Sequence, residues 1–317
     1  MQTVFLDQAS MDRGDIDFSG LDREAPGWRA YSNTEPSQVL ERIHDAEIVI
    51  SNKVILDRDI LSATHALKLV CVAATGTNNV DLAAAHENAI MVSNARAYAT
   101  SSVVEHVFTL LTNLLRNLGD YQLASVDGRW MHSQQFCYID KPICELAGKT
   151  MGIIGYGELG RAVADMARAF NMDVLLGQRP GSDQAQPGRM AIDEMLPQID
   201  VLSLHCPLAD NTRNLIDKHS FELMPGHAVL INTARGGIVN EGDLLQALLS
   251  GQIAAAGLDV LHEEPPVHGN ALLDCAIPNL IITPHVAWAS REARQRLLDE
   301  VVQNIVVFQS GEIRNRV

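Results

Sequence analysis

The sequence predicts an α/β fold built from parallel sheets. Short apolar runs such as Thr3–Leu6 and Ile48–Ile50 alternate along the 317-residue chain with segments of helical periodicity. One such run breaks directly onto three glycines spaced as G-x-G-x-x-G, and a helical pattern follows. Several later runs end in polar or glycine residues, as strands do at the ligand-binding edge of an open parallel sheet.

Composition sets limits on the class of protein. The chain is long enough for two domains, and its 47% hydrophobic and 20% charged residues are ordinary for a globular protein. A formal charge of −15 argues against nucleic acid or an anionic membrane as a partner. Met1–Asp7 lacks the basic flank and apolar core of a signal peptide, and no apolar run is long enough to span a bilayer. The five cysteines show no metal-binding spacing, so we expect buried reduced thiols, no metal site and a cytoplasmic protein.

Residues 1–98 predict a small α/β domain with parallel strands. The turn-rich segment 74–79 follows one strand, and Asp81 is placed to cap the next helix. The predicted strands are Thr3–Leu6, Ile48–Ile50, Leu67–Ala73 and Ile90–Val92, and the predicted helices are Pro36–Ile43 and a segment ending at Glu87.

A long amphipathic helix and an irregular segment come next. From Ser101 apolar residues recur at intervals of three and four, and we expect Gly119 to end this helix, which suits a rigid connector between domains. The segment Asp127–Leu146 carries Trp130 and Phe136 without periodicity. Because a monomer would bury these aromatics poorly, we expect an arm within residues 119–146 that contacts a second subunit.

The stretch from Lys149 to Gly160 predicts a strand, a glycine turn and a helix. Gly155 permits the tight turn, Gly157 lets the backbone approach a pyrophosphate, and Gly160 lets the helix lie close on the strand. The free N–H groups at the helix N-terminus face the phosphates. We therefore predict that this unit binds a dinucleotide.

Further strands complete a parallel set, and a helix from Arg291 to about Phe308 follows them. The predicted elements after the glycine turn are a helix at 161–170 and strands at 173–176, within 200–207, within 228–237, at 253–260 and within 280–285.

Three ionisable residues stand at the ends of successive predicted strands: Arg235, Glu264 and His285. Each alone has an ordinary explanation as a surface or loop residue, but together they supply what hydride transfer to a 2-keto acid requires. A guanidinium fixes the carboxylate through a two-pronged contact and polarises the carbonyl. An imidazolium donates a proton near neutral pH, and a carboxylate beside it favours its charged form, raises its pKa and orients it.

This ordered set of motifs resembles the D-isomer-specific 2-hydroxyacid dehydrogenase family, and the resemblance covers nearly the whole chain. Several short sequence segments are similar to those of one branch of the family, the bacterial glycerate dehydrogenases, or hydroxypyruvate reductases. The family motifs are Gly155–Gly160, His205–Leu208 with Thr212, Asn232–Gly237, Leu258–Val260 with Glu264-Pro265, and Thr283–His285; the branch segments are Gln135–Cys137, Ile154–Gly160, Gly177–Pro180 and His285–Trp288.

The resemblance implies an NAD(P)-dependent oxidoreductase acting on a small D-2-hydroxy acid, with D-glycerate and hydroxypyruvate, or glyoxylate, as expected substrates. It implies two Rossmann-like domains, in which a dinucleotide-binding domain (99–285) is inserted into a split substrate-binding domain (1–98 and 286–317). It also implies a homodimer. One alternative stays open, a dinucleotide-sensing binding protein of the corepressor type that does not turn over substrate.

The resemblance also assigns roles to particular residues. Asp259 would hold the nicotinamide carboxamide, and the loop of Thr75, Gly76 and Thr77 would present N–H groups to the substrate carboxylate. The implied cofactor-binding residues are Gly155, Gly157, Glu158, Leu159, Gly160, Gln178, Arg179, Cys206, Pro207, Thr212, Thr233, Ala234, Arg235, Asp259 and His285. The implied substrate-binding residues are Thr75, Gly76, Thr77, Arg235, His285 and Trp288.

One departure from the family pattern bears on the cofactor. NAD-preferring members carry an acid about twenty residues beyond the glycines, which binds the ribose 2′-hydroxyl. Here the strand that begins at Asp173 ends in Gly177, Gln178 and Arg179. Gln178 cannot repel a 2′-phosphate and Arg179 offers a cation, so we predict that NADP(H) is accepted in preference to NAD(H).

Overall fold

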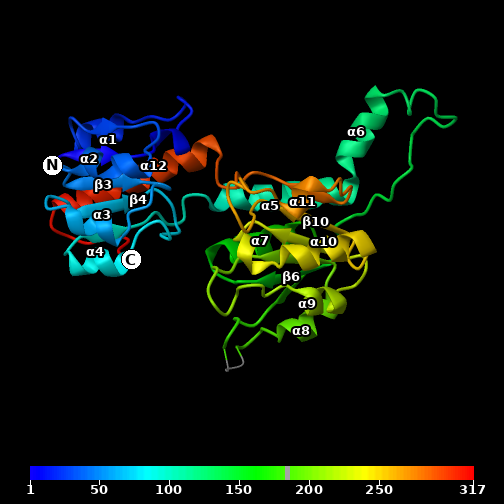
Figure 1. The fold of residues 1–317 in the computed structure, drawn as a ribbon. Coiled ribbons are helices and arrows are strands. Elements are labelled where there is room, and N and C mark those ends of the chain that lie inside the picture. The colour runs from blue at the N-terminus through cyan, green and yellow to red at the C-terminus, as the bar shows by residue number, and fades with distance from the viewer. Residues whose placement is uncertain (183–185) are drawn as a thin grey trace. The chain divides into compact units, whose positions relative to one another are not determined.

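The computed structural model describes residues 1–182 and 186–317, and the chain divides into two compact units (Figure 1). One unit comprises residues 1–99 with 288–317, and the other comprises residues 100–287. The predicted domain boundaries, after residue 98 and before residue 286, lie beside these. Among the described residues, no helix is long and apolar enough to cross a membrane.

The first unit contains a five-stranded parallel sheet in the order β2-β1-β3-β4-β5. Asp81 caps α4 as predicted, since its side chain accepts a hydrogen bond from the amide of Ala84 at 2.8 Å. Helix α12 packs against α1 and β4. The strands are β1 (Thr3–Phe5), β2 (Arg29–Ala30), β3 (Ile48–Ser51), β4 (Leu69–Val72) and β5 (Met91–Ser93). The helices are α1 (Ser19–Glu24), α2 (Val39–Ile43), α3 (Arg58–Ala63), α4 (Leu82–Glu87) and α12 (Arg291–Gln309), with 3₁₀ turns at Gln8–Ser10 and Pro36–Gln38.

The second unit contains a six-stranded parallel sheet in the order β11-β10-β9-β8-β6-β7. Two parallel sheets and an α/β architecture confirm the predicted fold class. The strands are β6 (Thr150–Ile154), β7 (Asp173–Leu176), β8 (Val201–Leu204), β9 (Val229–Asn232), β10 (Ala255–Leu258) and β11 (Leu280–Ile282). The helices are α5 (Thr100–Arg116), α6 (Leu118–Val126), α7 (Glu158–Ala169), α8 (Ile192–Met195), α9 (Lys218–Leu223), α10 (Glu241–Ser250) and α11 (Ala271–Asp274), with 3₁₀ turns at Leu196–Gln198 and Gly236–Ile238.

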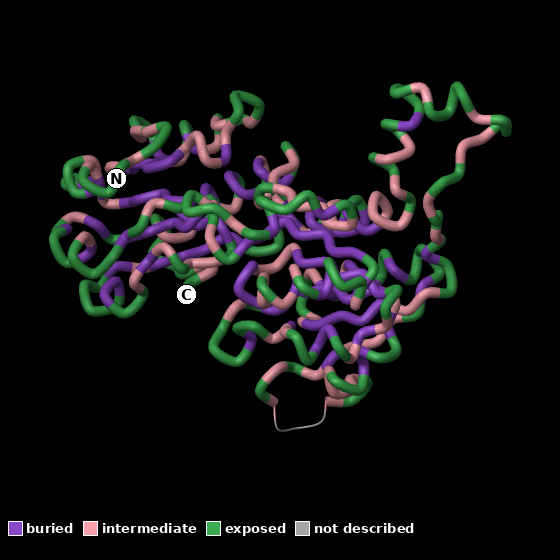
Figure 2. Tube along the Cα trace, turned by 45° about the vertical axis from the view of Figure 1, so that its right-hand side comes forward, coloured by how far each residue is buried: buried purple, intermediate pink, exposed green. Residues whose placement is uncertain are grey.

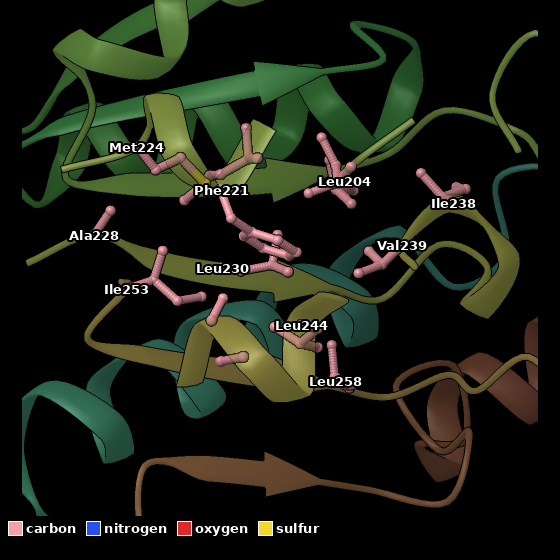
Figure 3. Close-up of a cluster of buried hydrophobic side chains, with 14 of the residues drawn as sticks. Leu204, Phe221, Met224, Ala228, Leu230, Ile238, Val239, Leu244, Ile253 and Leu258 are labelled. Carbon is pink, nitrogen blue, oxygen red and sulfur yellow. The ribbon is translucent and has the colours of Figure 1, made fainter. Parts of the chain in front are cut away.

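Apolar side chains from helices α9 and α10 close over one face of this second sheet (Figure 3). Phe221 of α9 and Leu244 of α10 lie against Leu230 of β9, and all three are almost completely buried. Each side chain of this size contributes about 1.5–3 kcal/mol when fully buried. All four residues of β8, β9 and β10 are buried, because parallel strands are covered on both faces (Figure 2). This core fixes the strand ends that carry the site.

The prediction that Gly119 ends the long helix was wrong. Helix α5 ends at Arg116, Asn117 takes a left-handed conformation with φ of +48°, and Gly119 lies inside the next helix, α6. Asparagine is one of the few residues that tolerate this conformation. Its side-chain amide also donates to the carbonyl oxygen of Pro142 at 2.7 Å. This bend turns α6 and the following loop away from the sheet (Figure 1).

The expectation of buried thiols holds for only two of the five cysteines. Cys71 and Cys206 are buried, Cys137 and Cys144 are partly exposed, and Cys275 is exposed. Cys137 and Cys144 lie in the arm, and Cys275 directly follows the short helix α11. All five are free thiols.

Candidate active site

The glycine turn between β6 and α7 is built by close backbone packing. Gly155 has a φ of +95°, and a Cβ there would overlap the backbone of His205 and Cys206 beyond β8. A Cβ at Gly160 would overlap the carbonyl oxygen of Gly155. By contrast, a Cβ at Gly157 would meet nothing within 4 Å. Two glycines are therefore required by the fold, while the third borders open space.

The surroundings of this turn fit a dinucleotide. Among the described residues no side chain caps the N-terminus of α7, which leaves its first amides for a ligand at the open space beside Gly157. Within the described residues, Nδ1 of His205 and Oγ1 of Thr233 are buried polar atoms without a hydrogen-bond partner. Both follow neighbouring strands, β8 and β9. Burial lowers the pKa of His205 to about 4, so its ring is neutral. Polar groups of a cofactor would satisfy such atoms.

A hydrogen-bonded loop follows His205. The hydroxyl of Thr212 donates to the carbonyl oxygen of Pro207 and accepts from the amide of Ala209, both at 2.7 Å. Thr212 is buried, Cys206 is also buried, and Pro207 is exposed. Thr212 thus fixes the shape of the loop that presents Pro207 at the strand ends.

Gly177, Gln178 and Arg179, which directly follow β7, include no acid. Gln178 donates its side-chain amide to the carbonyl oxygen of Ser182 at 3.1 Å, and Arg179 is exposed. A second cation, Arg189, lies with its guanidinium 5.9 Å from the ring centroid of Tyr156, inside the glycine turn. Arg189 is not predicted from the sequence, because nothing in its local sequence links it to that turn.

Arg235 follows β9 on a turn locked by a buried amide. The side chain of Asn232 accepts from the amide of Ala234 at 3.0 Å and donates to the carbonyl oxygen of Arg235 at 2.9 Å. The guanidinium Nη1 of Arg235 donates to the carbonyl oxygen of Ala234 at 2.7 Å. Gly236 lies so close to the backbone of Leu261 that a Cβ would overlap it. The loops that follow β9 and β10 are therefore adjacent.

Glu264 and His285 meet at the ends of β10 and β11. Glu264 Oε2 lies 2.6 Å from Nδ1 of His285, and Glu264 Oε1 accepts from the amide of Leu261 at 2.9 Å. About a third of each side chain of the pair is exposed, 33% for Glu264 and 31% for His285. The carboxylate is anchored by its own loop and contacts Nδ1 at the edge of the imidazole, while the ring keeps access to solvent. This geometry suits an acid–base pair.

Asp259, at the end of β10, is buried and organises the loop after β11. Its carboxylate accepts from the amides of Val286 at 2.9 Å and Ala287 at 2.8 Å. Burial alone would raise the pKa of Asp259, but hydrogen bonds from His106, Thr283 and these amides outweigh it and hold the pKa below its ordinary value.

The remaining predicted substrate residues belong to the first unit. The hydroxyl of Thr75 donates to the carbonyl oxygen of Ala95 at 3.0 Å, in the loop that follows β4 and contains Gly76 and Thr77. Trp288 packs edge-on against Tyr98, with ring centroids 6.4 Å apart. Their part in binding substrate stays a prediction.

Comparison with known proteins decides the family. Residues 108–287 match the family described as "D-isomer specific 2-hydroxyacid dehydrogenase, NAD binding domain". The chain belongs to this family. The match confirms the predicted family, the enzyme class and the nicotinamide cofactor.

Relatives of this 2-hydroxyacid dehydrogenase extend over the whole chain. It is 45% identical to the glycerate dehydrogenase of Methylorubrum extorquens, over 99% of this chain and 98% of that one. It is 38% identical to the hydroxypyruvate reductase of Blautia hydrogenotrophica, over 98% of both. Among solved structures, the NADPH-dependent glyoxylate/hydroxypyruvate reductase of Sinorhizobium meliloti superposes with a TM-score of 0.84 at 27% identity, covering 100% of this chain and 97% of that one.

Proposed function

We propose that this dehydrogenase interconverts hydroxypyruvate and D-glycerate, and reduces glyoxylate, with NADPH or NADH. The observation that carries the proposal is the Glu264–His285 pair at 2.6 Å, with Arg235 on the adjoining loop at the same edge of the sheet. The names of its relatives support the choice among small 2-keto acids. We assign cofactor binding to residues 100–287 and substrate selection to the other unit.

The mechanism divides the work among three side chains. When bound, the nicotinamide supplies the hydride that the substrate carbon receives. The guanidinium of Arg235 binds the substrate carboxylate and polarises the carbonyl. Nε2 of His285, on the side of the ring opposite Glu264, delivers a proton to the carbonyl oxygen. Glu264 accepts the N–H of Nδ1, which fixes the ring orientation and stabilises the imidazolium. In the oxidative direction the neutral imidazole takes the hydroxyl proton.

Replacement of His285 tests this mechanism. We expect His285→Ala to lower kcat for hydroxypyruvate reduction by about 10² or more, with an unchanged Kd for NADPH by fluorescence titration. His268 offers a matched control, because its Nδ1 also lies 2.6 Å from a carboxylate, Glu263, but its side chain is 83% exposed. His268→Ala should keep wild-type kcat. Turnover by His285→Ala close to that of the wild type would remove His285 from the mechanism.

Substrate choice is tested by steady-state kinetics. We expect the highest kcat/KM with hydroxypyruvate and lower values with glyoxylate and pyruvate, because both of these acids lack the hydroxyl of hydroxypyruvate. A binding protein of the corepressor type would bind NADPH without oxidising it in the presence of any of these acids. Preference for pyruvate would contradict the substrate assignment while leaving the dehydrogenase mechanism intact.

We further propose that two copies associate through the arm, residues 119–146. The arm is internally ordered: the indole N–H of Trp130 donates to the carbonyl oxygen of Phe136 at 3.1 Å, and the hydroxyl of Tyr121 donates to that of Lys141 at 2.7 Å. Yet Phe136 is 93% exposed and Met131 is 78% exposed. Large apolar side chains held in fixed positions on the surface are typical of an interface with another chain.

Light scattering tests the dimer. We expect twice the chain mass at micromolar concentration, and a monomer for Phe136→Asp, since a charge at the centre of an apolar interface is costly. Val267→Asp serves as the control, because Val267 is also exposed, at 71%, but lies outside the arm. A monomeric wild type would overturn this part of the proposal.

A further inference from the structure

Helix α5 places a histidine beneath the loop that carries His285. Nε2 of His106 lies 2.9 Å from Oγ1 of Thr283 and 3.4 Å from Oδ1 of Asp259. Only 17% of the His106 side chain is exposed. None of the steps described above uses this imidazole, so its place in the network needs an explanation.

The loop after β11 depends on Asp259 for its shape. The backbone amide of His285 donates to the carbonyl oxygen of Asp259 at 2.8 Å, and the carboxylate of Asp259 accepts from the next two amides, those of Val286 and Ala287. His285 itself has a φ of +55°, a left-handed conformation that a non-glycine residue keeps only when its surroundings impose it. The Asp259 carboxylate is therefore the clamp that holds His285 in this conformation.

The hydrogen-bond donors around this clamp determine which nitrogen of His106 is protonated. The hydroxyl of Thr283 donates to Oδ1 of Asp259 at 2.5 Å, so its oxygen is an acceptor toward His106. An ionised carboxylate only accepts. Nε2 of His106 faces both oxygens, and it must therefore carry a hydrogen.

We propose that His106 is a positioning residue, which acts through Thr283 and Asp259 to hold the loop that presents His285 to the substrate. The proposal rests on the assignment of His285 as the acid–base residue. His106 does not take part in the proton transfer itself, because its N–H faces Thr283 and Asp259. It keeps the carboxylate clamp in place, and small displacements of a reacting group lower rates strongly.

Two substitutions of His106 separate this role from general packing. His106→Leu keeps the bulk but removes the N–H, and we expect kcat to fall by roughly tenfold with the Kd for NADPH within about twofold of the wild type. His106→Gln can place an amide N–H where Nε2 lies, and we expect it to restore most of the lost kcat. A purely structural role would not distinguish Leu from Gln in this way.

Amide hydrogen exchange measures the stability of the loop after β11 independently of enzyme activity. We expect the amides of Val286 and Ala287 to exchange roughly tenfold faster in His106→Leu than in the wild type or in His106→Gln. Asn113→Leu is the control, because Asn113 lies on the same helix and its side-chain amide donates to the carbonyl oxygen of Thr109 within that helix. Wild-type exchange in His106→Leu, or a Gln variant no better than Leu, would overturn the proposal. If the wild type reduced no 2-keto acid, the proposed function would fail, while exchange would still show whether His106 holds the loop.

Discussion

Gly157→Ala is the substitution that separates cofactor binding from folding. Gly157 has a φ of −85°, which alanine adopts readily, and an added Cβ would meet no atom within 4 Å. We expect the fold to lose only about 0.5–1 kcal/mol, the cost of alanine at a helix N-cap. The methyl group would occupy the space in front of the α7 amides. Loss of one hydrogen bond to a charged phosphate costs about 1.5–3 kcal/mol, equivalent to about 10- to 150-fold in the Kd for NADPH.

Fluorescence titration with NADPH and thermal unfolding measure the two effects separately. Gly160→Ala is the matched comparison, and we expect it to affect mainly the stability of the fold. Its Cβ would overlap the carbonyl oxygen of Gly155, so the backbone would have to shift. Overpacking of this kind costs about 1–3 kcal/mol or more, so Gly160→Ala should lower Tm more than Gly157→Ala does. An NADPH Kd for Gly157→Ala within twofold of the wild type would show that the pyrophosphate does not lie against this glycine.

Further predictions concern three other residues. Arg235→Lys should raise KM for hydroxypyruvate by about tenfold or more, because an ammonium cannot form the two-pronged contact; unchanged KM and kcat would place Arg235 outside the site. Wild-type kcat/KM should favour NADPH, and Gln178→Asp should turn the preference toward NADH, whereas a wild type favouring NADH by about tenfold, or about 1.4 kcal/mol, would contradict the reasoning. The guanidinium of Arg294, 2.6 Å from Asp15, holds the pKa of that carboxyl below its usual 3.8, so the pair stabilises the fold above that pH and less as pH falls below it. Asp15→Asn should therefore lower Tm at pH 7 but by a smaller amount near pH 3, and an equal loss at both pH values would rule out the ion pair as the cause.

Features with a local signal could be predicted from the sequence. The glycine turn combines a strand, three glycines and a helix within twelve residues, and Asp81 sits directly before the helix that it caps. Helix α10 also carries such signals, Asn240 at its N-cap and Gly251 in a left-handed conformation at its C-cap, but it is absent from the predicted elements. The helix break at Asn117 gave no comparable signal, because a distant carbonyl, that of Pro142, helps to stabilise it.

The candidate site also contains residues with a local sequence signal and a residue without one. Arg235, Glu264 and His285 can be predicted as site residues because each follows a predicted strand and because their chemistry is complementary. Their catalytic roles stay predictions, although the 2.6 Å contact between Glu264 and His285 is present. His106 could not be found in this way, because it lies within an amphipathic helix and its partner Thr283 is 177 residues further along the chain. Only tertiary structure brings such residues together.

The discontinuous first unit has a consequence for biosynthesis. Helix α12 buries Leu297, Leu298 and Val301 within the unit that residues 1–99 begin, yet the ribosome makes all of residues 100–287 before it. Residues 100–287 are contiguous and can fold as soon as they emerge, whereas residues 1–99 must wait with part of their apolar surface uncovered. We therefore expect residues 1–99 to reach their native state later than residues 100–287, although they are made earlier, and to need more protection by chaperones during translation.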